Sequence, residues 1–235
     1  MDRSGGSFRV RLATGVLIPI RDHNPRERFP VVTVSLIVLN ALVFFFQSQA
    51  SASQEELLIR AFGAIPRQIA RWHNVGSILT SMFLHGGWMH IIGNMWFLWL
   101  FGDNVEDALG RFRYLLFYFA AGTVAALAQC FSMPNSNVPM IGASGAIAGV
   151  LGGYVMLYPR ARILTLLFWT FVDIPAWVYL GIWFLSQFLL GAGSGVAWMA
   201  HVGGFLAGVG LIRLLAVRPR RAPVEVEYLP PGRWR

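Results

Sequence analysis

The feature that most constrains this chain is a series of apolar stretches that recur along it, most of them 18 residues or longer. A helix needs about 20 residues to span a hydrocarbon core of roughly 30 Å, and within lipid only helices and closed barrels satisfy their backbone hydrogen bonds. These stretches are too long and too continuous for barrel strands. The sequence therefore predicts an all-α polytopic membrane protein, a bundle of six transmembrane helices. The predicted spans are 30–47, 78–101, 114–131, 144–158, 175–190 and 196–215.

The spans divide the chain into three predicted regions. Residues 1–29 form a polar, arginine-rich cytoplasmic segment, whose short apolar patch at 16–20 is expected to rest on the membrane surface. Residues 30–217 form the membrane domain, and residues 218–235 form a cytoplasmic tail. A further apolar run at 163–169 is followed by Asp173 and Pro175, so we do not expect it to cross the membrane.

Composition agrees with a membrane protein and argues against nucleic-acid binding. The chain is 56% hydrophobic and only 13% charged, which is rare for a soluble domain. Its net charge of +8 comes entirely from arginine, because the sequence contains no lysine. Most arginines flank apolar segments, where they act as topology signals and contact anionic headgroups of the lipid bilayer. The single cysteine, Cys130, is expected to be a small core residue.

The distribution of arginine also predicts the orientation. The predicted inner loops and C-terminal end carry Arg111, Arg113, Arg160, Arg162, Arg213, Arg218, Arg220 and Arg221. The loops at 132–141 and 191–197 carry no charge, and only the first outer connection, at 48–77, departs from the rule with three arginines. We therefore expect a multi-pass protein of the cell membrane (plasma or inner), with both termini in the cytoplasm and spans two, four and six running inward.

The segment Gly142-Ala143-Ser144-Gly145 opens the fourth predicted span and admits two interpretations. The Ser144 hydroxyl can cap the helix by accepting a hydrogen bond from a backbone N–H of the first turn. Alternatively, Ser144 is a nucleophile, which requires a base that takes its proton. The second interpretation depends on a histidine at the same depth.

Two histidines are predicted to lie at the depth of Ser144. Because their spans run in the same direction, the interval to the first charged residue at the inner end gives the height of each. The intervals are sixteen residues from Ser144 to Arg160, twelve from His201 to Arg213 and thirteen from His90 to Asp103. At about 1.5 Å per residue, the three side chains lie roughly 24, 18 and 20 Å above the inner boundary. They can therefore meet in the outer half of the membrane.

Small residues favour close approach of the fourth and sixth spans. One stripe comprises Gly145, Gly149 and Gly153, and the other comprises Ala200, Gly204 and Gly208. Small residues at every fourth position let membrane helices pack backbone to backbone. Because Ser144 and His201 adjoin these stripes, the packing is expected to bring a nucleophile and a base together.

His90 and Asn94 lie four residues apart, so they share one face of the second span. Together with the Ser144 backbone N–H, they are suited to stabilise the oxyanion of a tetrahedral intermediate. The alternative is an ordinary hydrogen-bonded pair between helices. His85, beside Gly86 and Gly87, is expected to brace the neighbouring loop by hydrogen bonding.

Three motifs in this order resemble the signatures of the rhomboid family of intramembrane serine proteases. They are His85-Gly86-Gly87-Trp88-Met89-His90-Ile91-Ile92-Gly93-Asn94, then Gly142-Ala143-Ser144-Gly145, then Ala200-His201-Val202-Gly203-Gly204 with Gly208. The order and spacing are similar to those of bacterial six-span members, from about residue 30 to residue 215. Glu106 and Gly110 also resemble family positions that hold the helices together.

The resemblance implies roles for these residues. Ser144 would be the nucleophile and His201 the general base, without a third carboxylate; His90, Asn94 and the Ser144 backbone would form the oxyanion site, and Gly142 would shape the loop before the serine. The reaction would be hydrolysis of a peptide bond in or beside a transmembrane segment of another membrane protein, through an acyl-enzyme and without cofactor or metal. Water would enter from the outer side, past Asn135, Ser136 and Asn137. Substrate would enter laterally, near the fifth span and a glycine-rich cap at 191–195.

Two departures from the family pattern and several competing hypotheses remain. Many members carry Trp-Arg in the first outer loop, whereas this chain has Arg71-Trp72 in reversed order. Some members place a tyrosine one turn after the serine, where it stacks on the histidine, but here Ala148 occupies that position. A metal-dependent protease could use His85, His90 and His201, although the HExxH motif is absent. A haem-binding electron carrier would leave the Gly-Ala-Ser-Gly segment unexplained. A non-catalytic relative that binds and escorts transmembrane helices is the main alternative. The oligomeric state is left open.

Overall fold

The computed structural model describes residues 17–191 and 197–215. The cap at 192–195 and the tail at 218–235 lie outside the described residues. The helices are α1 (Val31–Ser48), α2 (Ala52–Phe62), α3 (Pro66–Ile69), α4 (Ser77–Thr80), α5 (Trp88–Leu109), α6 (Arg111–Ser132), α7 (Ser144–Leu157), α8 (Ala176–Gly191) and α9 (Trp198–Leu215). A short 3-10 helix, η1 (Ser81–Phe83), follows α4, and the strands are β1 (Leu17–Asp22), β2 (Arg162–Leu167) and β3 (Thr170–Pro175).

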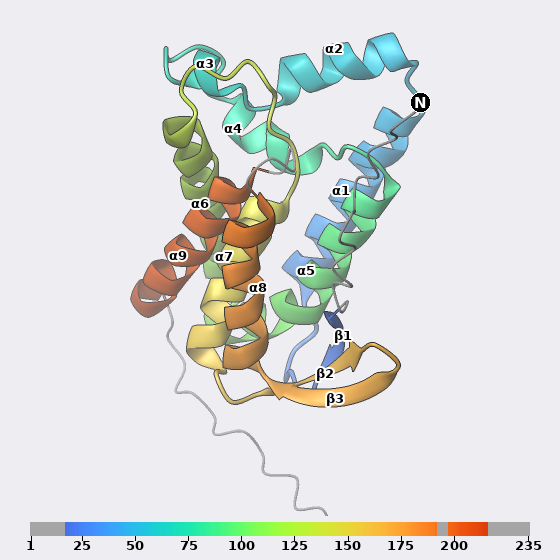
Figure 1. Ribbon diagram of the computed structural model, residues 1–235, viewed down its shortest axis with the longest axis vertical. Helices are drawn as coiled ribbons and strands as arrows, with labels where there is room; N and C mark the ends of the chain where they lie inside the picture. Colours follow the sequence, from blue (N-terminus) through green and yellow to red (C-terminus); the bar gives the residue numbers. More distant parts are fainter. Residues whose placement is uncertain (1–16, 192–196, 216–235) are drawn as a thin grey trace, which may run out of the picture.

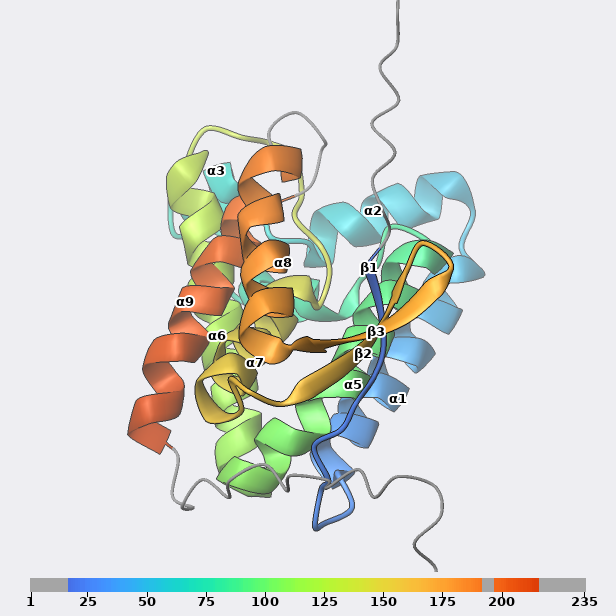
Figure 2. The same cartoon turned by 60° about the horizontal axis from the view of Figure 1, so that its bottom comes forward.

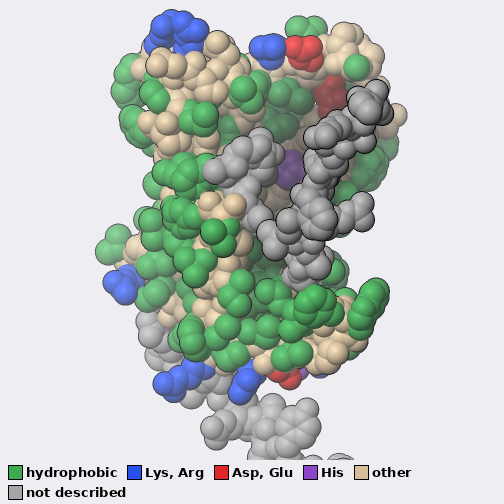
Figure 3. Space-filling view, viewed as in Figure 1, with side chains coloured by type: hydrophobic (Ala, Val, Ile, Leu, Met, Phe, Trp, Pro, Cys, Tyr) green, Lys and Arg blue, Asp and Glu red, His purple; other side chains and the backbone are tan. Residues whose placement is uncertain are grey.

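A bundle of long helices, with α7 packed against α9, α6 and α5, forms the body of the molecule (Figure 1). α1, α5, α6, α7, α8 and α9 lie close to the six predicted spans. Of the described helices, α1, α6 and α9 are by themselves long and apolar enough to cross a membrane, whereas α7 and α8 are apolar but shorter. Hydrophobic side chains cover the middle of the visible face, and arginines lie towards its two ends (Figure 3). That all six helices cross the membrane stays a prediction.

The second predicted span differs from its expected bounds. Residues 77–83 form two short helical turns, α4 and η1, and the chain then breaks at His85-Gly86-Gly87. Gly87 has φ +144°, a conformation that side chains with a Cβ rarely adopt, and α5 begins at the next residue. The helix therefore covers Trp88–Leu109 in place of 78–101.

The prediction of an all-α fold is wrong in one respect. Strands β1, β2 and β3 form an antiparallel sheet, in that order, across the end of the bundle (Figure 2). The apolar run at 163–169 supplies most of β2. Residues 17–20 of the patch at 16–20, which was expected to rest on the membrane surface, pair with it as part of β1. In β2 the buried Ile163 and Thr165 alternate with more exposed neighbours, which is the period of a strand. The run is too short to be told from a buried helix by hydrophobicity alone.

Glycines let α7 and α9 meet at their backbones. A Cβ at Gly204 would collide with the carbonyl oxygen of Gly145, and one at Gly208 would collide with that of Gly149. The predicted stripe on α7 differs at its inner end, because Gly153 faces side chains of α6 and α9, while Gly152 approaches the backbone of Phe205. The two helices that carry Ser144 and His201 are thereby held at a fixed separation.

The first turn of α1 is capped by a residue of another helix. α1 has no side-chain cap of its own. Glu106 of α5, which is almost fully buried, accepts hydrogen bonds from the backbone N–H groups of Val32 and Thr33 and from the Thr33 hydroxyl, at 2.8 to 2.9 Å. A carboxylate at a helix N-terminus satisfies unpaired donors and interacts favourably with the helix dipole. Glu106 therefore joins α1 to α5.

Asp22, the last residue of β1, attaches the sheet to the bundle. Its Oδ2 accepts hydrogen bonds from the Tyr154 hydroxyl at 2.6 Å and from Asn104 Nδ2 at 3.0 Å. Burial of the carboxyl raises the pKa of Asp22 to about 7, although the Tyr154 hydrogen bond opposes the shift. The carboxyl therefore stays partly protonated near neutral pH in the folded protein.

This raised pKa predicts a pH dependence of stability. Between about pH 4 and 7 the folded protein retains a proton on Asp22 that an unfolded aspartate has released, so the free energy of unfolding falls as the pH rises. We expect the Tm of the purified protein in detergent to decline across this window, and Asp22→Asn to remove part of the decline. Thermal unfolding of both proteins at a series of pH values measures the difference. Equal slopes for the two proteins would contradict the prediction.

Candidate active site

Ser144 is the first residue of α7, and the segment before it is held by backbone hydrogen bonds. Met140 exchanges two of them with Ala64, at 2.8 and 2.9 Å, and the Gly142 N–H donates to the Ser81 carbonyl at 2.9 Å. The N-cap residue of α7 is Ala143, and no side chain caps the helix. The capping interpretation of Ser144 is therefore wrong, and its hydroxyl is available for another partner.

That partner is His201, in the first turns of α9. His201 Nε2 lies 2.8 Å from Ser144 Oγ, within hydrogen-bond distance. The other ring nitrogen, Nδ1, lies 2.7 Å from Oε1 of Gln187 on α8. Three helices thus contribute one side chain each to a continuous hydrogen-bonded chain, and both Ser144 and His201 are half-buried.

Gly142 and His90 fit against each other beside the serine. Gly142 has φ +120°, and a Cβ built there would lie 2.7 Å from His90 Nε2. The His90 ring therefore occupies the space that any other side chain at 142 would need. His90 Nδ1 accepts a hydrogen bond from the Gly86 N–H at 3.2 Å, which fixes the ring.

Asn94 and His85 are arranged differently from His90. Asn94 is buried, and its Nδ2 donates to the His90 carbonyl within α5 at 2.8 Å. Of the predicted site residues that the structure describes, His90, Gly142, Ser144 and His201 line the cavity described below, whereas Asn94 and His85 do not. The fully buried His85 braces its loop through its main chain, since its N–H and carbonyl both bond to the Gln47 amide, while its ring packs edge-on against His90.

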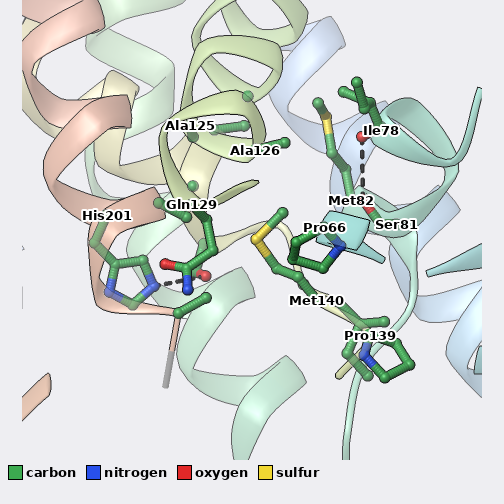
Figure 4. Close-up of a pocket in the computed structure, with 18 of the residues that line it drawn as sticks. Pro66, Ile78, Ser81, Met82, Ala125, Ala126, Gln129, Pro139, Met140 and His201 are labelled. Carbon is green, nitrogen blue, oxygen red and sulfur yellow. Dashed lines mark hydrogen bonds between the residues drawn. The ribbon is translucent and has the colours of Figure 1, made fainter. Parts of the chain in front are cut away.

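A cavity of about 770 Å³ opens beside Ser144 and His201. Its wall includes the apolar side chains of Ile78, Met82, Ala125, Ala126, Pro139 and Met140 (Figure 4). Gln129 of α6 also lines the cavity, and its side chain is drawn in the same view as the His201 ring. Gln129 Oε1 is buried and has no hydrogen-bond partner among the described residues. The cavity is therefore mostly apolar, with a few polar groups at the serine, as expected of a site for an apolar peptide segment.

Sequence reasoning missed two glutamines at this site. Gln187 bonds to His201, and Gln129 lines the cavity; both lie within apolar helices. Polar side chains inside a membrane span are costly and mark functional sites, so each was a usable signal. Of the polar residues expected along the water entrance, Ser136 lines the cavity.

A metal-dependent site gains no support from the arrangement. Within residues 17–191 and 197–215, no three His, Cys, Asp or Glu side chains lie close enough together to hold a metal ion. The ring centroids of His85 and His90 are 5.0 Å apart, but His201 instead contacts Ser144 and Gln187. The geometry assembles a hydroxyl with an imidazole base.

Comparison with known proteins identifies relatives of this chain. A family model described as "Rhomboid domain" matches residues 70–218. The chain is 33% identical over 181 residues to "Rhomboid protease GluP" of Bacillus subtilis, an alignment that covers 76% of this chain and 34% of that protein. It is 29% identical over 176 residues to "RHOMBOID-like protein 5" of Arabidopsis thaliana, covering 74% of this chain and 55% of that protein. The chain thus spans about a third to a half of the length of these curated relatives.

Proposed function

Since this chain belongs to the rhomboid family of multi-pass membrane proteins, as the matched domain and its relatives establish, we propose that it is an intramembrane serine endopeptidase. It hydrolyses peptide bonds in or next to transmembrane segments of other membrane proteins, and Ser144 and His201 are its catalytic residues. The observation that carries the proposal is the 2.8 Å contact between Ser144 Oγ and His201 Nε2. A serine hydrogen-bonded to a histidine, beside a cavity, is the minimal machinery for acyl transfer.

The proposed reaction has two halves. His201 Nε2 takes the proton of the Ser144 hydroxyl as Oγ attacks the scissile carbonyl, and the resulting imidazolium then protonates the leaving amine. The C–N bond breaks and leaves an acyl-enzyme on Ser144. In the second half His201 takes a proton from a water as that water attacks the ester carbonyl. The bond between the carbonyl carbon and Ser144 Oγ then breaks, His201 returns the proton to Oγ, and the carboxyl product leaves.

The oxyanion of each tetrahedral intermediate needs hydrogen-bond donors. We assign this role to the Ser144 backbone N–H, which points out of the N-terminus of α7, and to the side chains of His90 and Asn94. His90 is supported by its place in the cavity wall against Gly142. Asn94 donates to its own helix in this structure, so its participation requires the amide to turn when substrate binds.

The proposed setting follows from charge and hydropathy. Six helices cross the cell membrane with both termini in the cytoplasm, which places the sheet on the inner side and the loop at 132–141 on the outer side. Water then reaches the dyad past Ser136, and the substrate's transmembrane segment approaches laterally through the lipid bilayer, beside α8. The partner is the apolar helix of another membrane protein, which matches the largely apolar cavity wall.

The experiment that tests the proposal is covalent labelling with a fluorophosphonate. We expect the detergent-purified protein to be labelled on Ser144 and to cleave a reporter that carries a transmembrane segment. Ser144→Ala removes the nucleophile, and His201→Ala removes the base, so both variants are expected to lose the label. A folded wild-type protein that takes no label and cleaves no reporter would favour a non-catalytic role in binding and escorting transmembrane helices.

A further inference from the structure

Gln187, on α8, supplies the second hydrogen bond of the His201 ring. Its Oε1 lies 2.7 Å from His201 Nδ1, opposite the nitrogen that contacts Ser144. We propose that Gln187 is the positioning residue of the dyad: it holds the imidazole in the tautomer and orientation that let Nε2 receive the proton of Ser144. The inference rests on the proposed function of the same site and adds a third member to it.

The orientation of the Gln187 amide follows from its other partners. Its Nε2 donates to the Trp183 carbonyl at 2.9 Å and lies 3.2 Å from Ser186 Oγ. A backbone carbonyl only accepts hydrogen bonds, so the amide must present its NH₂ group to Trp183. The oxygen of the amide therefore faces His201, and this assignment follows from the hydrogen-bond network.

The tautomer of His201 follows in turn. An amide oxygen only accepts, so His201 Nδ1 must carry the proton of this hydrogen bond. In a neutral imidazole the other nitrogen, Nε2, then has a free lone pair. That lone pair faces the hydroxyl of Ser144, which is the arrangement that a general base requires.

Residues of α8 also hold the plane of the ring. Trp183, one turn before Gln187, lies beside His201 with ring centroids 6.1 Å apart and an angle of 37° between the rings. Ala148 of α7, which stands where some rhomboid proteases have a tyrosine, is fully buried and has no group that could orient the histidine. In this chain the orienting groups therefore come from α8, through a hydrogen bond and a ring contact.

This arrangement makes the base sensitive to the position of α8. α8 packs on α9 through aromatic pairs, with centroids 4.8 Å apart for Phe184 and Phe205 and 5.6 Å apart for Phe188 and Trp198. Its outer side is exposed, since Leu185 is 62% exposed. A displacement of α8 away from α9 would break the Gln187–His201 bond, so the dyad is aligned only while α8 is docked.

The test compares Gln187→Leu and Gln187→Glu with the wild type in cleavage of a transmembrane reporter across a range of pH. Leucine removes the acceptor while keeping similar volume, and we expect kcat to fall about 10- to 100-fold, with KM little changed. Glutamate places a carboxylate against Nδ1 and stabilises the imidazolium. We therefore expect the acid limb of the kcat/KM profile to move up by about one to three pH units.

The controls separate this role from a structural one. Trp177→Ala changes the same helix in its first turn, at the end opposite Gln187, at a position that is 60% exposed, and it should leave the rate and the pH profile unchanged. A packing role for Gln187 would not move the acid limb. If the leucine variant unfolds, the pH profile of the glutamate variant alone tests whether Gln187 positions His201.

Two results are distinguishable. If the wild type is active, two results overturn the role of Gln187 and leave the proposed function intact. One is a leucine variant with the wild-type kcat, and the other is a glutamate variant whose acid limb does not move. A folded wild-type protein that cleaves nothing overturns the proposed function, and the role of Gln187 falls with it.

Discussion

The variants Ser144→Ala, His201→Ala and the double variant are expected to lose the same activity, about 10⁴- to 10⁶-fold in kcat for cleavage of a transmembrane reporter. Residues that act as a unit are not additive, because removing either the nucleophile or its base disables the same step. The contact of 2.8 Å between Oγ and Nε2 is the physical basis for this coupling. Steady-state rates of all three variants in detergent, at matched protein concentration, measure it.

Matched controls are available in the same chain. Ser35 is an exposed serine of α1 whose hydroxyl bonds to its own helix, and His73 is an exposed histidine of the first connection. Alanine at either position should leave kcat unchanged. The coupling of Ser144 and His201 is contradicted if the double variant is slower than the wild type by the product of the two single effects, or if one single variant keeps near-wild-type activity.

The positions of the long helices other than α5 followed from hydropathy, because the cost of unpaired backbone groups in lipid leaves few alternatives to a helix. The approach of His201 to Ser144 also followed, from their similar heights in spans that were predicted to run the same way. Their similar heights place the two side chains at the same depth in the membrane. The glycines of α7 and α9 then set the distance between the two helices.

Other features depended on information that a single stretch of sequence does not carry. The run at 163–169 is short and apolar, and its assignment as β2 is decided by pairing with β1, nearly 150 residues earlier in the chain. The pairing of Gln187 with His201 depends on the rotation of α8 about its axis, which hydropathy leaves open because most of that helix is apolar. Likewise the amide of Asn94 shares a face with His90, yet it bonds within its own helix.

Replacing Gly208 by alanine is expected to destabilise the protein by roughly 3 kcal/mol, at the upper end of the usual range for overpacking. The new Cβ would collide with the carbonyl oxygen of Gly149 and lie 2.8 Å from its Cα, and backbone cannot yield as a flexible side chain can. α9 must therefore move away from α7. Gly210→Ala is the matched control, because a Cβ there meets nothing within 4 Å.

The same displacement should also lower the activity. His201 and Gly208 lie on one helix, so a shift of α9 lengthens the contact between His201 and Ser144, and an error of about 1 Å in a catalytic group can cost roughly 10²-fold in rate. We expect Gly208→Ala to lower both Tm and kcat, whereas Gly210→Ala keeps kcat and holds or raises Tm through its better helix propensity. Thermal unfolding and reporter cleavage on the two variants measure both effects. Equal behaviour of the two alanine variants would mean that the α7–α9 contact tolerates a Cβ, and that the glycines do not set the distance across which Ser144 and His201 react.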